Sequence, residues 1–185
     1  MNVQKLTQRS AEALTRAQDT AVEYQNNAVE PEHLLYSLMT QENGLIPQLM
    51  TKMNVDEQAF SDAVLSVISQ MPKVSGSGRQ SGSVYISSET DRIMIDAEKK
   101  ASNMKDEYVS VEHIMISMID KPNNEVKNIF KIFNVTKEEF LKVLKDVRGN
   151  VRVTTDNPES TYDVLSKYGQ DLVERARTGK LDPVI

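Results

Sequence analysis

The chain contains one segment twice, and this duplication limits its possible folds more than any other feature. Residues 29–39 read VEPEHLLYSLM and residues 109–119 read VSVEHIMISMI, with Val, Glu, His and Ser at the same places. Aligning His33 with His113 defines a register between the two copies, which we call the repeat register, and it relates further pairs without a gap. These pairs are Thr7 and Ser87, Ala17 and Ala97, Ala21 and Ala101, Asn54 and Asn134, and Phe60 and Phe140. The sequence therefore predicts two similar halves.

Apolar residues three and four apart predict that each half begins with an amphipathic helix. The two stripes are Leu6, Ala13, Leu14, Ala17, Ala21 and Tyr24, and Ile86, Ile93, Met94, Ala97, Ala101 and Met104. Thr7 stands at the N-cap of the first helix, and Ser87 or Ser88 at that of its counterpart. The duplicated segment forms the second helix, because Pro31 suits a first helical turn and Ser110 a cap.

Two shorter patterns complete each half. Residues 46–53 and 126–133 predict a third helix, and a fourth helix starts at Asp56 or at Thr136, where Thr136 and Glu139 fit a capping box. We therefore predict an all-α fold with two pseudo-symmetric four-helix repeats packed into one domain. The first repeat covers residues 1–70 and the second covers residues 86–149.

The predicted connections differ in composition from the repeats. Residues 71–85 are rich in Gly and Ser and lack the Gly-Lys-Ser/Thr ending of a phosphate loop, so we interpret them as a linker. Residues 150–185 begin with a polar, turn-rich run, and their later apolar residues predict one more helix that ends near Gly179.

Composition excludes several classes of function. The net charge is −5 and no basic run is present, which argues against nucleic-acid binding. The absence of cysteine excludes disulfides, thiol nucleophiles and cysteine-ligated zinc, and is typical of a reducing compartment. No apolar run approaches the roughly 20 residues of a membrane span, and the first residues do not resemble a signal peptide. We therefore expect a cytoplasmic location and no membrane contact.

The two histidines allow two interpretations. His33 and His113, with Glu32 and Glu112, could supply four ligands to a metal at the interface between the repeats. Against this, adjacent residues on a helix point about 100° apart, and a histidine at such a turn suits a hydrogen bond within its own repeat. We expect the structural role. The sequence offers no metal site, and it contains no arrangement of residues typical of a catalytic site.

Two pairs of residues suggest binding. The pairs are Thr7 with Glu32, and Ser87 with Glu112. A helix N-terminus favours an anion, and a carboxylate beside it favours a cation, above all a guanidinium in bidentate contact. Such a site would suit a group or peptide that carries both charges. The same residues could instead serve only as helix caps and first-turn acids, and the sequence leaves both interpretations open.

The duplicated Glu-His unit and the tail resemble the Clp AAA+ unfoldases. Residues 168–185 read YGQDLVERARTGKLDPVI, which is similar to the segment that leads into the first ATPase module of this family. The linker at residues 70–78 and the run at residues 147–162 are similar to those of the ClpB disaggregases. ClpC, the partner of a protease, is the alternative. ClpC-like domains tend to carry Arg two positions after both caps, whereas this chain has Arg9 but Glu89.

The resemblance implies a function and a set of partners. A ClpB-like N-terminal domain would recognise unfolded or aggregated polypeptide for a hexameric AAA+ ring that uses ATP and Mg²⁺ and works with a DnaK-type chaperone. A ClpC-like domain would instead receive adaptor proteins or phosphoarginine at sites such as Thr7 and Glu32. In either case, this fragment would be a monomer, would hold no cofactor and would not be an enzyme, and residues 150–185 would begin the first AAA+ module.

The resemblance also places an apolar substrate groove between the repeats. Ile93, Met94, Tyr108 and Val109 match positions that line this groove, and Glu112 lies at its rim. Three consecutive apolar residues, Ile93 to Ile95, cannot all face inward on one helix, so at least one of them should be exposed.

Overall fold

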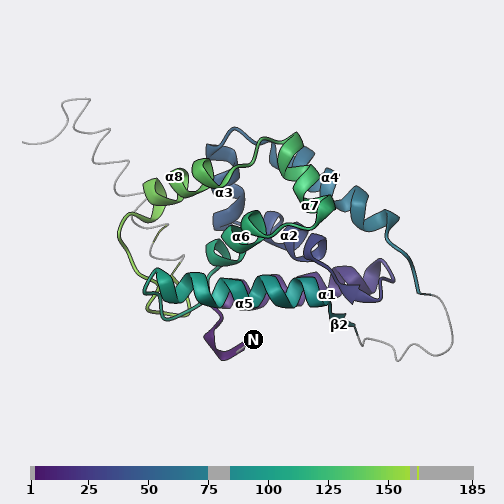
Figure 1. The fold of residues 1–185 in the computed structure, drawn as a ribbon, viewed down its shortest axis with the longest axis horizontal. Coiled ribbons are helices and arrows are strands. Elements are labelled where there is room, and N and C mark those ends of the chain that lie inside the picture. The colour runs from purple at the N-terminus through teal and green to yellow at the C-terminus, as the bar shows by residue number, and fades with distance from the viewer. Residues whose placement is uncertain (1–2, 75–83, 159–161, 163–185) are drawn as a thin grey trace, which may run out of the picture.

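The computed structural model describes residues 3–74, 84–158 and 162, and this part of the chain is mostly helical (Figure 1). The first repeat contains α1 (Gln8–Glu23), α2 (Pro31–Met39), α3 (Leu45–Lys52) and α4 (Glu57–Gln70), preceded by the short helix η1 (Val3–Lys5). The second contains α5 (Ser88–Asn103), α6 (Val111–Asp120), α7 (Asn124–Ile132) and α8 (Lys137–Arg148). Each repeat also has one short strand: β1 (Ala28–Val29) precedes α2, and β2 (Tyr85–Ile86) precedes α5. The all-α prediction is confirmed.

Most of residues 71–85 and 159–185 lie outside the described part of the chain. The glycine-rich linker, the further helix and the start of an ATPase module that the sequence predicts in these ranges therefore stay predictions. No helix within the described ranges has the length and apolar character needed to cross a membrane.

The predicted caps are present at the starts of the helices. The Thr7 hydroxyl accepts a hydrogen bond from the Ser10 amide at 3.2 Å, and the Ser87 hydroxyl accepts one from the Thr90 amide at 3.2 Å. Of the two serines considered for the second cap, Ser87 is the cap, and the helix begins at Ser88. The Thr136 hydroxyl accepts in the same way from the Glu139 amide. These local signals fix where the helices begin because each cap bonds an amide that the helix itself leaves free.

The helices form three layers (Figure 1). Helices α1 and α5 form one outer layer, α2 and α6 the middle layer, and α3, α4, α7 and α8 the other outer layer. Because α2 and α6 are covered on both sides, almost all of their side chains are buried, including Glu32, His33, Glu112 and His113. Polar groups in such a position need partners within the protein.

The two repeats interlock through backbone pairs near the starts of their helices. The segment before α5 pairs in parallel with the segment before α2, with Val29 opposite Ile86, and the Ser87 amide donates to the Val29 carbonyl at 3.2 Å. Symmetrically, Leu6 bridges to Val109, and the Thr7 amide donates to the Val109 carbonyl at 3.0 Å. The repeat register converts one set of contacts into the other. Each repeat therefore supplies a segment to the other.

The turns follow the same symmetry. Gln25 and Lys105 have positive φ angles of 59° and 60°, and Asn54 and Asn134 have φ angles of 59° and 54°. Asparagine tolerates this left-handed region better than most residues. Nearly equal backbone geometry at positions matched by the repeat register shows that the duplication extends to the loops.

We predict that Phe60→Ala destabilises the whole domain. The Phe60 ring, on α4, is fully buried and packs against Phe130 and Phe133 of the second repeat, with ring centroids 6.3 Å and 5.1 Å apart. Its removal should lower the free energy of unfolding by about 3–5 kcal/mol in urea denaturation. The control Ile132→Ala, at a side chain that is 72% exposed, should change it by about 0.5 kcal/mol or less. A similarly small loss for Phe60→Ala would mean that the repeats do not share this core.

Candidate functional site

The interlocking of the repeats determines which helix cap lies beside which carboxylate. The sequence interpretation paired Thr7 with Glu32 and Ser87 with Glu112. In the structure Glu32 and Ser87 line one cavity, and Thr7 bonds to the segment that leads into α6, the helix of Glu112. The predicted pairing is therefore wrong. The cap and the carboxylate of each site come from different repeats because β2 of the second repeat pairs with β1 of the first.

The cavity at Glu32 has a volume of about 610 Å³ and lies where the two repeats meet. We call it the Glu32 pocket. Its walls come from the turn before α2, the end of α4, the start of α5 and the turn before α7. The lining residues are Asn26, Asn27, Ala28, Glu30, Glu32, Met71, Pro72, Tyr85, Ser87, Ser88, Glu89 and Asn123.

Glu32 is a buried carboxylate without a cation. Its side chain is 2% exposed, Oε1 accepts a hydrogen bond from the Asn123 side-chain amide at 2.7 Å, and Oε2 has no hydrogen-bond partner. Burial raises the pKa of Glu32, and the negative charges of Glu30 and Glu89 raise it further. No ion pair to Glu32 is formed within the described residues. Such a group gains most from a ligand that brings positive charge and donors.

The corresponding carboxylate of the second repeat has a cation within its own chain. Arg148 donates to Glu112 Oε1 at 3.4 Å and to both carboxylate oxygens of Asp106. In the repeat register, Ile68 stands in place of Arg148 and Asn26 in place of Asp106. The second repeat thus contains an internal guanidinium that the first repeat lacks.

Each histidine bonds within its own repeat, as the structural interpretation predicted. His33 Nδ1 accepts from the Glu30 amide at 2.9 Å, and its Nε2 contacts Asn26 Oδ1 at 2.9 Å. His113 repeats this arrangement with the Ser110 amide at 3.0 Å and Asp106 Oδ2 at 2.8 Å. Within the described ranges no three His, Asp or Glu side chains are placed to hold a metal ion. The metal interpretation therefore has no geometric support.

The apolar groove predicted along α5 is not open. Ile93, Met94 and Val109 are all buried in the core, and Tyr108 is half-buried. The prediction that Ile93, Met94 and Val109 offer a substrate surface is wrong, because α5 packs against both α6 and α2 and all three side chains belong to the hydrophobic core. The narrower expectation that one of three consecutive apolar residues is exposed is confirmed by Ile95, at 38%.

Sequence reasoning missed two residues of the Glu32 pocket. Tyr85 falls in the predicted linker, yet it lies in β2, is 60% exposed, and accepts a hydrogen bond from Asn27 at 2.9 Å. The sequence signal that could have indicated Tyr85 is an aromatic residue two positions before the predicted cap Ser87. Asn123 reaches Glu32 from 91 residues away in the sequence, and no local pattern indicates such a contact.

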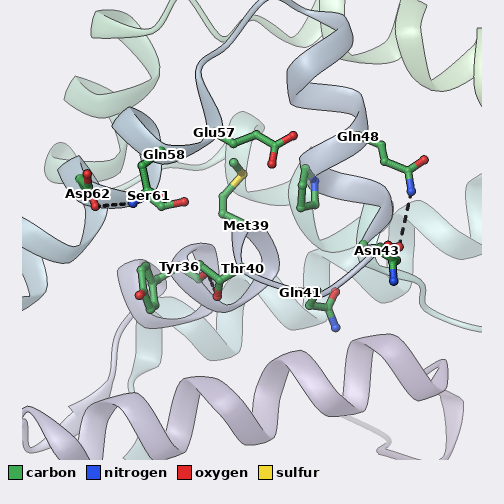
Figure 2. Close-up of a pocket in the computed structure, with 12 residues that line it drawn as sticks. Tyr36, Met39, Thr40, Gln41, Asn43, Gln48, Glu57, Gln58, Ser61 and Asp62 are labelled. Atoms are coloured by element: carbon green, nitrogen blue, oxygen red, sulfur yellow. Dashed lines mark hydrogen bonds between the residues drawn. The ribbon is translucent and has the colours of Figure 1, made fainter.

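A second cavity, of about 490 Å³, lies between α2, α3 and α4 of the first repeat (Figure 2). Its polar side chains largely satisfy one another: Glu57 accepts from Thr51, Asp62 accepts from Gln58 at 2.9 Å, and Gln48 donates to the Asn43 carbonyl at 3.5 Å. Its lining residues, all within the described ranges, include no buried, unpartnered carboxylate comparable to Glu32. We therefore regard the Glu32 pocket as the stronger candidate site.

Comparisons with known proteins agree with the architecture. The chain matches the family model described as the Clp repeat (R) N-terminal domain over residues 5–133. It is 43% identical over 185 residues to the chaperone protein ClpB of Clostridium tetani, covering 100% of this chain and 21% of that protein. The chain thus spans about a fifth of the length of that relative.

Two solved structures have a similar fold. One is the Hsp104 N-terminal domain from Candida albicans, with a TM-score of 0.72 and 18% identity, covering 83% of this chain and 97% of that one. The other is a ClpV N-domain in complex with a VipB peptide, with a TM-score of 0.59 and 18% identity, covering 77% and 89% of the two chains. At these identities the likeness establishes the fold alone.

We predict that acidification from pH 6.5 to pH 4 destabilises the domain through His33. Burial lowers the pKa of His33 to about 4, whereas an unfolded histidine titrates near 6.5. Between these values the unfolded chain binds a proton that the folded chain excludes, so the free energy of unfolding should fall by up to about 3 kcal/mol as the pH falls. Urea denaturation across this range should show a shallower dependence in His33→Gln. An unchanged slope in that variant would assign the effect to other groups.

Proposed function

The chain belongs to the Clp repeat (R) N-terminal domain family, and from this membership we propose that it is the polypeptide-recognition domain of a ClpB-like chaperone. In this proposal the domain holds unfolded or aggregated chains and passes them to a hexameric AAA+ ring. ATP and Mg²⁺ would act in the ring, and a DnaK-type chaperone would engage the same larger protein. The domain itself then needs only to bind and release, and it requires no catalytic residue.

The observation that carries the proposal is the unsatisfied carboxylate of the Glu32 pocket. A buried Glu32 with one free oxygen suits a guanidinium or ammonium group from a client side chain. Tyr85, largely exposed at the edge, and Met71 and Pro72 offer apolar contact to the neighbouring client residues. Tyrosine at such a position also favours stacking with a cation. An arginine or lysine flanked by apolar residues therefore fits the pocket.

The negative charges around the pocket support a cationic client over a phosphorylated one. The ClpC-like alternative places phosphoarginine at such a site and needs a helix N-terminus that accepts an anion. Here Glu89 lies in the first turn of α5, and Glu30 lies close enough to raise the pKa of Glu32. A phosphate beside these carboxylates would be repelled. This argument favours unmodified polypeptide, with adaptor proteins or phosphoarginine as the alternative ligands.

Weak binding suits this role. Tight capture would oppose the transfer of a client to the ring, so we expect dissociation constants in the micromolar range or above, a binding free energy of about −8 kcal/mol or weaker. A pocket with one charged contact and a small apolar edge is consistent with this range. The fold also accommodates peptides, since a ClpV N-domain has been solved with one.

Titration with an unfolded polypeptide should locate the contact surface. We predict that a permanently unfolded, reduced and carboxymethylated protein shifts the amide resonances of Tyr85, Ser87 and Asn123 in heteronuclear NMR spectra. Residues of the other cavity, such as Gln48, should remain unchanged and serve as the internal control. Shifts confined to that cavity, or to α8, would reject the Glu32 pocket as the client site.

Substitution of Glu32 tests the charge of the contact. An unstructured peptide with one arginine between leucines should bind Glu32→Gln at least about tenfold more weakly than the unmodified chain, because one charge-assisted pair is worth roughly 1.5–3 kcal/mol. Glu57→Gln, in the cavity of Figure 2, is the matched control and should bind normally.

Two further ligands separate the alternatives in the same calorimetric titration. The peptide with citrulline in place of arginine should lose the same affinity as the Glu32→Gln variant, because it keeps the shape without the charge. Free phosphoarginine should compete no better than free arginine. Stronger competition by phosphoarginine would favour the ClpC-like function instead.

A further inference from the structure

We propose that copies of this domain associate head to tail, with α8 of one copy entering the cavity between α2, α3 and α4 of the next (Figure 2). We call this cavity the α4 pocket. The part of α8 that enters it is the stripe Lys137, Leu141 and Lys145, which we call the α8 ridge. The contact involves no client and does not depend on the function proposed above. It follows from the opposite character of two surfaces that the duplication relates.

The α4 pocket and the first turns of α8 occupy matched places in the two repeats, but their side chains differ in charge and size. Three pairs in the repeat register show this difference: Glu57 and Lys137, Asp62 and Lys142, and Ser61 and Leu141. The first repeat thus has two carboxylates and a small side chain where the second has two amines and a leucine. Surfaces that differ in this way are complementary between two copies.

The α4 pocket has an apolar floor. Met39 and Pro47 are buried there, and Tyr36 is half-buried beside them. The cavity has a volume of about 490 Å³, which lies within the range of pockets that enclose small ligands and leaves room for a leucine side chain. The floor therefore suits one apolar side chain of a partner.

The rim of the α4 pocket is acidic on the side of α4. Glu57 and Asp62 are exposed, and each accepts a hydrogen bond from a neutral donor, Thr51 and Gln58 respectively. The residues that line the pocket, all of which the structure describes, include no lysine or arginine. Arg16 donates to the Thr40 carbonyl at 3.1 Å, on the side of the pocket that faces α1 in Figure 2. The α4 side therefore remains negative.

The α8 ridge presents an exposed leucine between two lysines. Residues four apart lie on the same face of a helix, so Lys137 and Lys145 stand on either side of Leu141, which is 38% exposed. Lys145 is exposed and forms no ion pair within the described part of the chain. The ridge therefore combines an apolar side chain with positive charge.

The ion pairs next to the ridge do not cancel its charge. Lys137 pairs with Asp120 at 2.8 Å, and Lys121 pairs with Asp96 at 2.6 Å. Lys100 also contacts both aspartates. Three lysines thus share two aspartates, and the network keeps a net positive charge.

The α4 pocket fits the α8 ridge better than the Glu32 pocket does. An amphipathic helix docks by placing one apolar side chain in a groove and its charged neighbours on the rim. Glu57 and Asp62 lie exposed on a rim, where lysines on a folded helix can reach them. Glu32 is only 2% exposed and requires a side chain that enters the pocket. We therefore assign the ridge to the α4 pocket.

The proposed contact is heterologous and weak. Each copy offers one pocket and one ridge, so a pair of copies leaves one of each unused, and a third copy can add. One helical face in one cavity buries less than the roughly 1,000 Å² of a stable interface, so the domain should be a monomer at micromolar concentrations. An assembly that holds several copies together raises their effective concentration to the millimolar range, where such a contact forms.

A dilution series tests whether the contact forms. In heteronuclear NMR spectra recorded from about 0.02 mM to about 1 mM, the amide resonances of Ser61, Leu141 and Lys145 should shift with concentration. Those of Tyr85 and Ser87, in the Glu32 pocket, should stay constant as the internal control. Sodium chloride at about 0.5 M should reduce the shifts, because it screens exposed charges.

Mixing two variants tests whether the contact is heterologous. The pocket variant carries Glu57→Gln with Asp62→Asn, and the ridge variant carries Leu141→Ser with Lys145→Gln; all four side chains are exposed, so both variants should fold. Each alone should associate at least about tenfold more weakly than the unmodified chain. An equimolar mixture should form a one-to-one dimer in sedimentation equilibrium, because the pocket variant keeps its ridge and the ridge variant keeps its pocket.

The results that would overturn the contact are distinct. They are the absence of concentration-dependent shifts up to about 1 mM, and a mixture that fails to pair although both variants give dispersed spectra. Glu32→Gln is the matched control and should associate like the unmodified chain. Loss of association in that variant would place the ridge in the Glu32 pocket and reject the α4 pocket. Because these experiments contain no client peptide, none of these results bears on the function proposed above.

Discussion

The backbone pairing between the two repeats is the constraint on which the rest of this structure depends. Val29 and Val109 each accept a hydrogen bond from the cap residue of the other repeat, Ser87 and Thr7. This pairing brings the N-terminus of a long outer helix to the acidic first turn of a buried middle helix, twice in one domain. A domain built from one repeat could not form either site, because cap and carboxylate would then belong to separate molecules. Both the hydrophobic core and the pairing of a helix cap with a carboxylate therefore require the two repeats in one chain.

Divergence at two positions makes the two sites unequal. Arg148 and Asp106 stand where the first repeat has Ile68 and Asn26, and they form a buried ionic cluster with Glu112. Burial alone would raise the pKa of Asp106, but hydrogen bonds from His113, Arg148 and the Val153 amide outweigh it and lower the pKa to about 2. Asp106 therefore keeps its charge over the ordinary pH range, and the stability that it contributes is lost only as the pH falls below about 4 towards 2. Removing one partner of such a buried pair is strongly destabilising, because it leaves an uncompensated buried charge.

The sequence predicts the parts of this fold that depend on local signals. The periodic apolar stripes, the caps Thr7 and Thr136, and the structural role of His33 depend on residues close in the chain, and the structure confirms them. The crossed pairing of caps and carboxylates was predicted wrongly because it depends on which repeat donates each strand. The assignment of Met94 to an open groove failed because its full burial depends on α5 having two neighbours, α6 and α2. The contact of Asn123 with Glu32 follows only from the packed fold.

The inequality of the sites has a physical consequence for a domain that must release what it binds. Two open sites on one rigid body would allow a long unfolded client to bind at both, and the second contact would be intramolecular. Bivalent attachment of this kind raises the apparent affinity by about 10²–10⁴ without any new kind of contact. On the function proposed for this domain, such a gain would slow the transfer of the client. Because Arg148 already pairs with Glu112 and Asp106, the second carboxylate is neutralised within the chain, so attachment at the Glu32 pocket stays monovalent and therefore weak.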